Sequence, residues 1–176
     1  MQVGHINLAR SFKGTGEHFI SLVEGLQREG ISQYVLVRNV TMAKRLNTVH
    51  DVTVGPVVRS AVTACCLMPR LDLVHIHDMS AAQAGLLLVL TRSIPYVQSY
   101  TGDEAISRNP ITQAVYRRAT KVICGDDSEA SILRHYDPSL PIEIVPAMEI
   151  EGPADPYLHL YQNSQSTPMA GSSGIQ

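Results

Sequence analysis

The sequence contains no tryptophan and only two phenylalanines among its 176 residues. Large aromatic side chains are a major source of buried area in most cores, so this core must consist mostly of aliphatic side chains. The three cysteines, Cys65, Cys66 and Cys124, match neither a zinc-ligand spacing nor a C-x-x-C redox motif. We therefore predict buried thiols in a reducing compartment and no disulfide framework.

Excess charge of one sign is also missing. The 14 Lys and Arg residues and the 16 Asp and Glu residues give a formal net charge of −2. No overall basic field would attract nucleic acid, so we expect no nucleic-acid partner. One short basic cluster, Arg117, Arg118 and Lys121, lies at the end of a predicted helix, where it suits the helix dipole. A solvated face and contact with anionic lipid headgroups are the two interpretations of this cluster.

The chain has no long hydrophobic run. Its amino terminus lacks the basic flank, apolar segment and small-residue cleavage site of a signal peptide. The longest apolar stretch, residues 84–90, is too short to span a bilayer. We expect a cytoplasmic protein, and the basic cluster leaves peripheral contact with the inner face of the membrane as an alternative.

Short apolar segments alternate with amphipathic segments of helical period up to residue 145. Strands are predicted at 3–8, 34–37, 52–58, 71–78, 95–100, 121–124 and 142–145. Helices are predicted at 17–28, 41–46, 60–68, 80–91, 110–119 and 126–135. This alternation predicts an α/β fold, a Rossmann-like three-layer sandwich with a mostly parallel sheet of about six or seven strands.

The composition changes after Pro146. Residues 151–176 are rich in Pro, Ser, Gly and Gln and show little hydrophobic periodicity. We predict a domain at 1–149 and a linker or tail at 150–176.

The segment 71–78, L-D-L-V-H-I-H-D, reads as the central strand of the sheet, and it ends in polar residues. Ligands of open α/β sheets bind just beyond the carboxyl ends of such strands. His75 and His77 are two residues apart in a predicted strand, so their side chains should point the same way. We expect His75 to be a neutral core histidine that is hydrogen-bonded to the backbone, and His77 to be a site residue. Asp78 could orient a histidine, bind a hydroxyl group or cap the next helix. A metal site is conceivable, but neither the spacing nor a third ligand singles one out, so none is predicted.

A second candidate is the turn Gly14-Thr15-Gly16-Glu17 between the first strand and the first helix. Its backbone N–H groups, supported by the helix dipole, could hold a phosphate or a sugar oxygen. The alternative is a tight turn that lets the helix pack. The turn matches neither the dinucleotide G-x-G-x-x-G motif nor a P-loop, and we expect no bound cofactor.

The segment Thr101-Gly102-Asp103-Glu104 follows the strand at 95–100. Its carboxylates could bind a sugar hydroxyl or act as a base, although loop carboxylates are more often simply solvated. Asp126, Asp127 and Ser128 are interpreted first as helix caps.

Five segments in order suggest a family. They are G-T-G-E at 14–17, D-L-V-H-I-H-D at 72–78, P-Y-V-Q-S-Y-T-G at 95–102, K-V-I-C-G-D-D-S at 121–128 and I-E-I-V-P at 142–146. Over residues 1–149 the chain resembles the N-terminal domain of the GT-B glycosyltransferases, specifically the retaining group called glycosyltransferase family 4. The resemblance implies two Rossmann-like domains facing a cleft. The N-terminal domain receives the acceptor, and the C-terminal domain binds the nucleotide sugar and carries a Glu-x7-Glu signature.

The resemblance also implies roles for individual residues. His77 and Asp78 would line the acceptor cleft as catalytic residues, and the glycine turn would approach the donor diphosphate. The implied substrate-binding residues are Gly14, Thr15, Gly16, Glu17, Thr101, Gly102 and Asp103. Thr101 stands where the family often has histidine, and no nucleotide-sugar domain follows residue 146.

We therefore expect the acceptor-side half of a sugar transferase, inactive without a second domain. Its partners would be a nucleotide-sugar donor, a sugar or glycolipid acceptor, and a partner subunit or a second copy. The alternative is a non-catalytic binding module that kept the scaffold.

Overall fold

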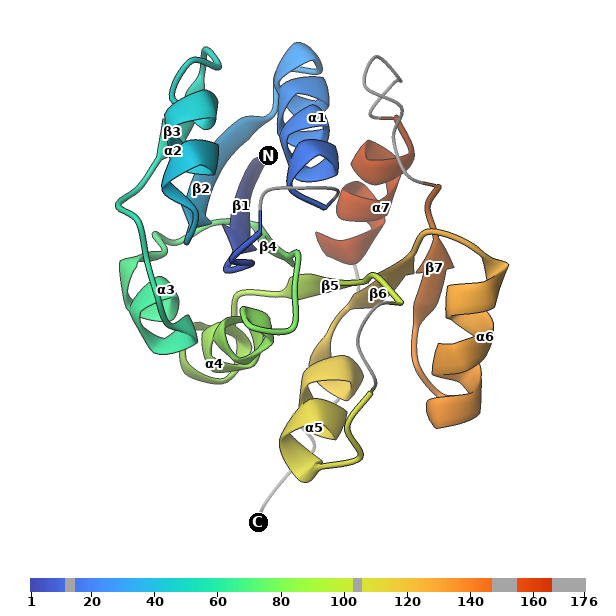
Figure 1. The fold of residues 1–176 in the computed structure, drawn as a ribbon. Coiled ribbons are helices and arrows are strands. Elements are labelled where there is room, and N and C mark those ends of the chain that lie inside the picture. The colour runs from blue at the N-terminus through green and yellow to red at the C-terminus, as the bar shows by residue number, and fades with distance from the viewer. Residues whose placement is uncertain (12–14, 103–105, 147–154, 166–176) are drawn as a thin grey trace.

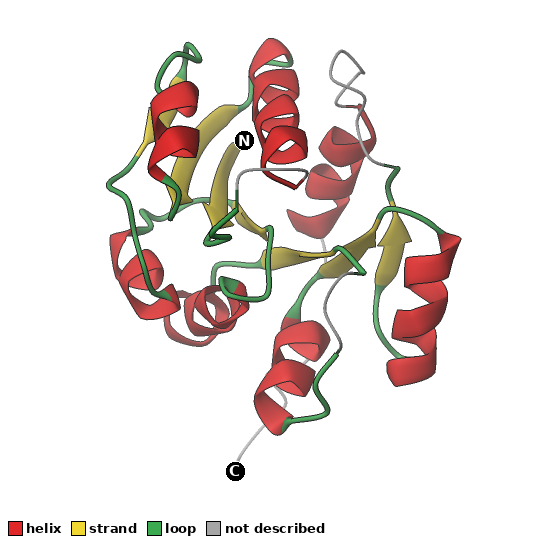
Figure 2. Ribbon diagram, viewed as in Figure 1, coloured by secondary structure: helices red, strands yellow, loops and turns green. Residues whose placement is uncertain are grey.

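The computed structural model describes residues 1–11, 15–102, 106–146 and 155–165. The described chain is a three-layer sandwich, with a central sheet covered by helices on both faces (Figures 1 and 2). The strands are β1 (Gln2–Asn7), β2 (Ser32–Val37), β3 (Val52–Val54), β4 (Leu73–Ile76), β5 (Tyr96–Tyr100), β6 (Lys121–Cys124) and β7 (Ile142–Ile144). The helices are α1 (Thr15–Arg28), α2 (Val40–Leu46), α3 (Ala61–Leu67), α4 (Ala82–Arg92), α5 (Pro110–Arg118), α6 (Asp127–Tyr136) and α7 (Asp155–Gln165).

The sheet has seven strands in the order β3-β2-β1-β4-β5-β6-β7. Every strand pairing within the described ranges is parallel. The predicted fold class, a Rossmann-like α/β sandwich, is confirmed. The predicted central strand, β4, is the middle one, and it pairs with β1 so that His5 lies opposite His75.

Local chemistry fixes where several helices begin. The side chain of Asn39 accepts hydrogen bonds from the first amides of α2, and Ser60 does the same for α3. Asn109 caps α5, and Pro110 occupies the first helical turn, where its missing N–H costs nothing. Asp126 caps α6 by accepting from the Glu129 amide, as its position in the sequence predicts.

The two faces of the sheet carry different helices. Helices α3, α4, α5 and α6 cover one face and pack on side chains such as Val74, Tyr96 and Val122. Helices α1, α2 and α7 cover the other face. Because side chains alternate along a strand, His5 and His75 point to this second face together with Val3 and Leu73.

Part of the segment predicted as a linker or tail, residues 155–165, forms helix α7. Tyr157, Leu160 and Tyr161 of this helix are buried against Leu73 and Val97 of the sheet. The periodicity is weak because the segment carries few aliphatic side chains, and two of its three buried contacts come from tyrosine. The division of the chain into a domain and a tail stays a prediction for the residues outside the described ranges.

Smaller differences concern boundaries and exposure. Helix α1 begins at Thr15, earlier than predicted, and β3 stops at Val54 because Gly55 and Pro56 interrupt it. Cys65 and Cys124 are buried free thiols, as predicted, whereas Cys66 is exposed.

Candidate functional site

A cavity of about 170 Å³ opens at the carboxyl ends of β5 and β6. Ser99 and Thr101 line it from β5 and the turn that follows, and Glu129 from α6. Helix α1 contributes His18 and helix α7 contributes Tyr157, whose hydroxyl lies 3.4 Å from His18 Nε2. Ligands of parallel sheets bind at this edge, where strands end and connections diverge. We take this cavity as the centre of the candidate site.

The carboxylate of Glu129 lies between two glycine turns. Its Oε2 accepts a 2.7 Å hydrogen bond from the Gly125 amide. Gly102 has a φ of +70°, and a Cβ built there would lie 2.9 Å from Glu129 Oε1. A side chain at position 102 would therefore be strained and would also collide with the carboxylate. The predicted site residues Thr101 and Gly102 thus meet the start of α6, whereas Asp103 lies outside the described residues.

A second cavity of about 450 Å³ shares a lining residue with the first. Tyr100, the last residue of β5, lines both cavities. Ile106 and Tyr136 line the second cavity together with Arg108, so it combines apolar side chains with one guanidinium group. Both cavities therefore offer apolar and polar groups.

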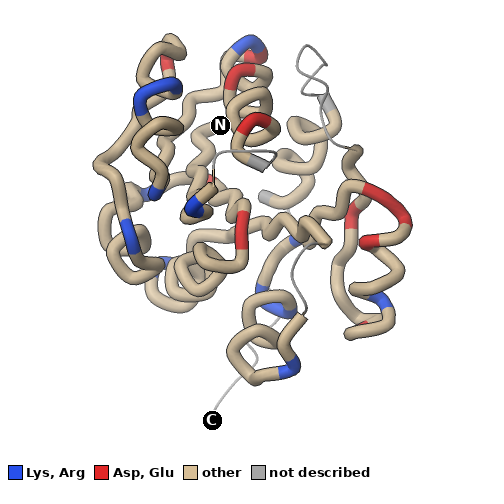
Figure 3. The backbone as a smooth tube through the Cα atoms, viewed as in Figure 1, with Lys and Arg blue, Asp and Glu red and all other residues tan. Residues whose placement is uncertain are grey.

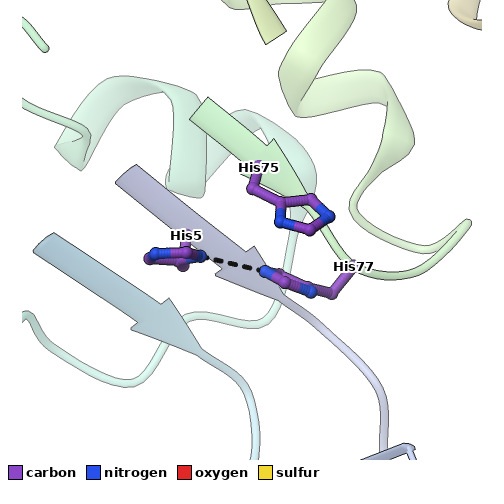
Figure 4. Close-up of side chains that lie close together, drawn as sticks. All are labelled: His5, His75 and His77. Atoms are coloured by element: carbon purple, nitrogen blue, oxygen red, sulfur yellow. Dashed lines mark hydrogen bonds between the residues drawn. The ribbon is translucent and has the colours of Figure 1, made fainter. Parts of the chain in front are cut away.

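Three histidines lie beneath this edge, on the face covered by α1 and α7 (Figure 4). The rings of His75 and His77 are 3.8 Å apart, so the two side chains point the same way, as predicted. His77 Nε2 lies 3.0 Å from His5 Nδ1 and forms a hydrogen bond with it. Phe19 of α1 packs on the His77 ring at 4.5 Å, which brings the start of α1 close to the end of β4.

His75 is a core histidine, as predicted. Its hydrogen bonds are to side chains, however, and not to the backbone. Its Nδ1 lies 2.6 Å from the Tyr161 hydroxyl and its Nε2 lies 2.7 Å from Ser99 Oγ. His75 therefore links α7 to β5. Ser99 also lines the cavity, so one residue separates the histidine cluster from the candidate site.

Burial keeps the three rings neutral. It lowers the pKa of His5 to about 3, because the charged form loses its hydration in the core. Burial also lowers the pKa of His75 and of His77 well below the usual value, and the neighbouring histidines lower both further. Each ring therefore keeps one nitrogen free to accept a hydrogen bond or a ligand at neutral pH.

Asp78 ties two strand ends together. Its Oδ2 accepts a 2.6 Å hydrogen bond from the Leu8 amide after β1, and its Oδ1 accepts from the Ala81 amide before α4. Burial raises the pKa of Asp78, and these backbone donors oppose the shift. The sequence left open whether Asp78 orients a histidine, binds a hydroxyl group or caps the next helix. In the structure its carboxylate stabilises the turn before α4. The catalytic roles predicted for Asp78 and His77 stay predictions, and His77 is almost fully buried.

The glycine turn is described only in part. Gly14 lies outside the described residues, while Thr15, Gly16 and Glu17 form the first turn of α1. Gly16 is buried and Glu17 is exposed. The predicted role of these residues in holding a diphosphate stays a prediction.

Two further cavities open at the opposite, amino-terminal edge of the sheet. One has a volume of about 220 Å³ and the other about 460 Å³. They share Ser32, Asp51 and Thr53 and contain none of the predicted site residues. Because parallel sheets bind ligands at the carboxyl edge, we do not assign a function to these two cavities.

The charges around the cavity are mostly negative. Figure 3 shows acidic residues gathered where α6 begins, and these are Asp126, Asp127 and Glu129. Basic residues are scattered along the backbone of several helices in the same view. This side of the cavity therefore favours hydroxyl groups, which donate to carboxylates, over phosphate groups.

The sequence did not reveal every residue at this edge. His5 and His18 received no role, and Tyr157 and Tyr161 belong to the segment predicted as a tail. The sequence shows only that His5 lies in a predicted strand. Its contact with His77 depends on the pairing of β1 with β4, which are separated by two strands in sequence.

No protein-family model matches the sequence, and no curated protein matches it either. Solved structures do match. The Anabaena protein HepE in complex with UDP-glucose has a TM-score of 0.68 and 11% identity over 85% of this chain and 44% of that one. A glycosyltransferase from Rickettsia africae has a TM-score of 0.64 and 12% identity over 82% of this chain and 42% of that one.

These likenesses establish the fold. At 11% and 12% identity they leave substrate and activity open. The chain spans less than half the length of either structure. Among its described helices, none combines the length and the apolar character needed to cross a membrane.

Proposed function

We propose that this chain is the acceptor-side domain of a GT-B glycosyltransferase that uses a nucleotide-sugar donor. The observation that carries the proposal is the pair of cavities at the carboxyl edge of the sheet that share Tyr100. The fold likeness to one part of the HepE structure, which contains UDP-glucose, supports it. The finer assignment to a retaining enzyme of the family 4 type rests on the sequence motifs.

The chemistry of the site suits an acceptor better than a donor. The carboxylate of Glu129 and the acidic start of α6 can accept hydrogen bonds from sugar hydroxyls, and the same charges would repel a diphosphate. The second cavity offers Ile106 and Tyr136 to an apolar group and Arg108 to an anionic one. A sugar joined to a lipid or another apolar aglycone would therefore find partners in both cavities.

The predicted residues take the following roles in this proposal. Thr101 and Gly102 contact the acceptor, and the first turn of α1 faces the donor diphosphate. His77 and Asp78 hold the ends of β1 and β4 in place beneath the site. The donor would be bound by a second domain, on the same polypeptide or another one, because transfer needs groups from both walls around one transition state.

The experiment is an NMR titration of the ¹⁵N-labelled chain with octyl glucoside below its micellar concentration, and separately with methyl glucoside. We expect both probes to shift the amides of Thr101, Gly102 and Gly125. Octyl glucoside should bind more tightly because its alkyl chain can also contact Ile106 and Tyr136. Amides of Asp51 and Thr53 at the opposite edge should not move.

The matched variants are Glu129→Gln and Glu29→Gln, since Glu29 is an exposed residue just after α1. Losing a charged acceptor of a sugar hydroxyl should weaken binding about tenfold. The Glu29 variant should bind as the parent does. Shifts confined to the amino-terminal edge, or no response to either glycoside, would reject the acceptor role and favour the non-catalytic module. Sugar transfer from UDP-glucose by the purified chain alone would reject the half-enzyme interpretation.

A further inference from the structure

The histidine cluster holds three potential metal ligands from two strands that are distant in sequence. One ligand nitrogen from each of His5, His75 and His77 lies within 4.8 Å of the other two. All three side chains are buried, so an ion bound by them would be enclosed by the core. We propose that this cluster binds a divalent transition-metal ion of the Zn²⁺ type.

The separation of two ligand atoms is close to what an ion requires. Zn–N bonds of about 2.0–2.1 Å at tetrahedral angles place two nitrogens about 3.3 Å apart. His5 Nδ1 and His77 Nε2 are 3.0 Å apart, so a small outward rotation of either ring admits the ion between them. The ion then takes the place of the proton that the two nitrogens now share.

His75 completes the set by turning within its present site. Its ring lies 3.8 Å from that of His77 and 6.0 Å from that of His5. A turn that brings one nitrogen to the ion leaves the other bonded to Ser99 or to Tyr161, the two partners it already has. Such a second bond is the usual way in which a metal-binding histidine is oriented.

The protonation state of the cluster also suits a metal. An imidazole must be neutral to bind a metal, and burial already keeps these three neutral. Whichever of His5 and His77 carries the proton of their shared hydrogen bond needs only to move it to its other ring nitrogen. Binding therefore has little proton competition to overcome near neutral pH.

The ligand type selects the metal. Imidazole nitrogens suit Zn²⁺, Cu²⁺, Ni²⁺ and Co²⁺, whereas Mg²⁺ and Ca²⁺ require oxygen ligands. Three histidines leave a fourth position for water or an anion, which would offset part of the charge of the buried ion. Ser99 connects the cluster to the cavity, so the ion would lie one residue away from the proposed acceptor site. The inference does not depend on the proposed function.

The first experiment is a Co²⁺ titration of the full chain after treatment with chelator and its removal, followed by competition with Zn²⁺. We expect one equivalent of Co²⁺ to give the intense visible bands of a tetrahedral site, and Zn²⁺ to abolish them. His5→Gln and His77→Gln should weaken binding by at least about 100-fold. His50→Gln and His159→Gln are the controls, because both residues are exposed, and they should bind like the parent.

A second measurement uses the unaltered chain, so it does not depend on whether the variants fold. The sequence has seven histidines, and ¹⁵N NMR of their rings identifies which bind Zn²⁺. Coordination shifts at His5, His75 and His77 alone are expected. Shifts confined to the exposed His50, His135 and His159, or weak binding that the exposed-residue controls reduce, would overturn the proposal. Loss of metal binding without loss of glycoside binding in His5→Gln would separate this inference from the proposed function.

Discussion

Replacing Leu160 by Ala tests whether α7 belongs to the folded domain. Leu160 is 5% exposed and packs with Tyr157 and Tyr161 against the sheet. Removing a buried leucine side chain costs about 2–5 kcal/mol, from lost burial and from the cavity left behind. With a urea dependence of about 2 kcal/mol per molar, the midpoint of unfolding should fall by about 1–2.5 M.

The matched control is His159→Ala, one residue earlier on the same helix. His159 is exposed, so its replacement should change the free energy of unfolding by no more than about 0.5 kcal/mol. Urea unfolding followed by circular dichroism measures both variants. If Leu160→Ala matched the control, α7 would contribute nothing to stability, and the original prediction of a tail would be right.

Two further predictions concern the core. Gly85 of α4 has no room for a side chain, since a Cβ there would lie 2.6 Å from the Tyr96 ring. Gly85→Ala should lower the free energy of unfolding by up to about 2 kcal/mol, because the cost of overpacking exceeds the gain of about 1 kcal/mol in helix propensity. A thermal melt measures the change. A stabilised variant would show that the Tyr96 ring moves aside. The second prediction is acid sensitivity in the presence of EDTA. Burial lowers the pKa of His5, His75 and His77 in the folded chain. As the pH falls below about 6.5, these histidines therefore take up protons only in the unfolded chain. The free energy of unfolding should then decrease by up to about 4 kcal/mol per pH unit. Equal urea midpoints at pH 7.5 and 5.5 would contradict it.

The sequence alone was enough for the order of elements from β1 to β7 and for the central strand. Apolar runs such as the one before His77 are long enough for a strand and too short for a helix, and polar residues end them where the sheet ends. The cap at Asp126 and Pro110 at the start of α5 follow from local chemistry that acts within one turn. These features need no knowledge of the rest of the chain.

The histidine cluster shows where local information stops. The spacing of His75 and His77 predicts a shared direction, which the structure confirms. The third member, His5, is joined to them only because β1 pairs with β4 in a register that puts His5 opposite His75. The partners of His75 on its other side come from β5 and α7, again through packing of distant segments.

Helix α7 also depends on contacts between distant segments of the chain. Its sequence carries weak periodicity, and its helical state is stabilised by the apolar face of the sheet on which Tyr157, Leu160 and Tyr161 pack. Helix caps and the polar ends of strands are set by neighbours within a few residues, so the sequence determines them. The pairing of β1 with β4, the cavity and the histidine cluster join segments far apart along the chain, and only the tertiary structure brings them within contact distance.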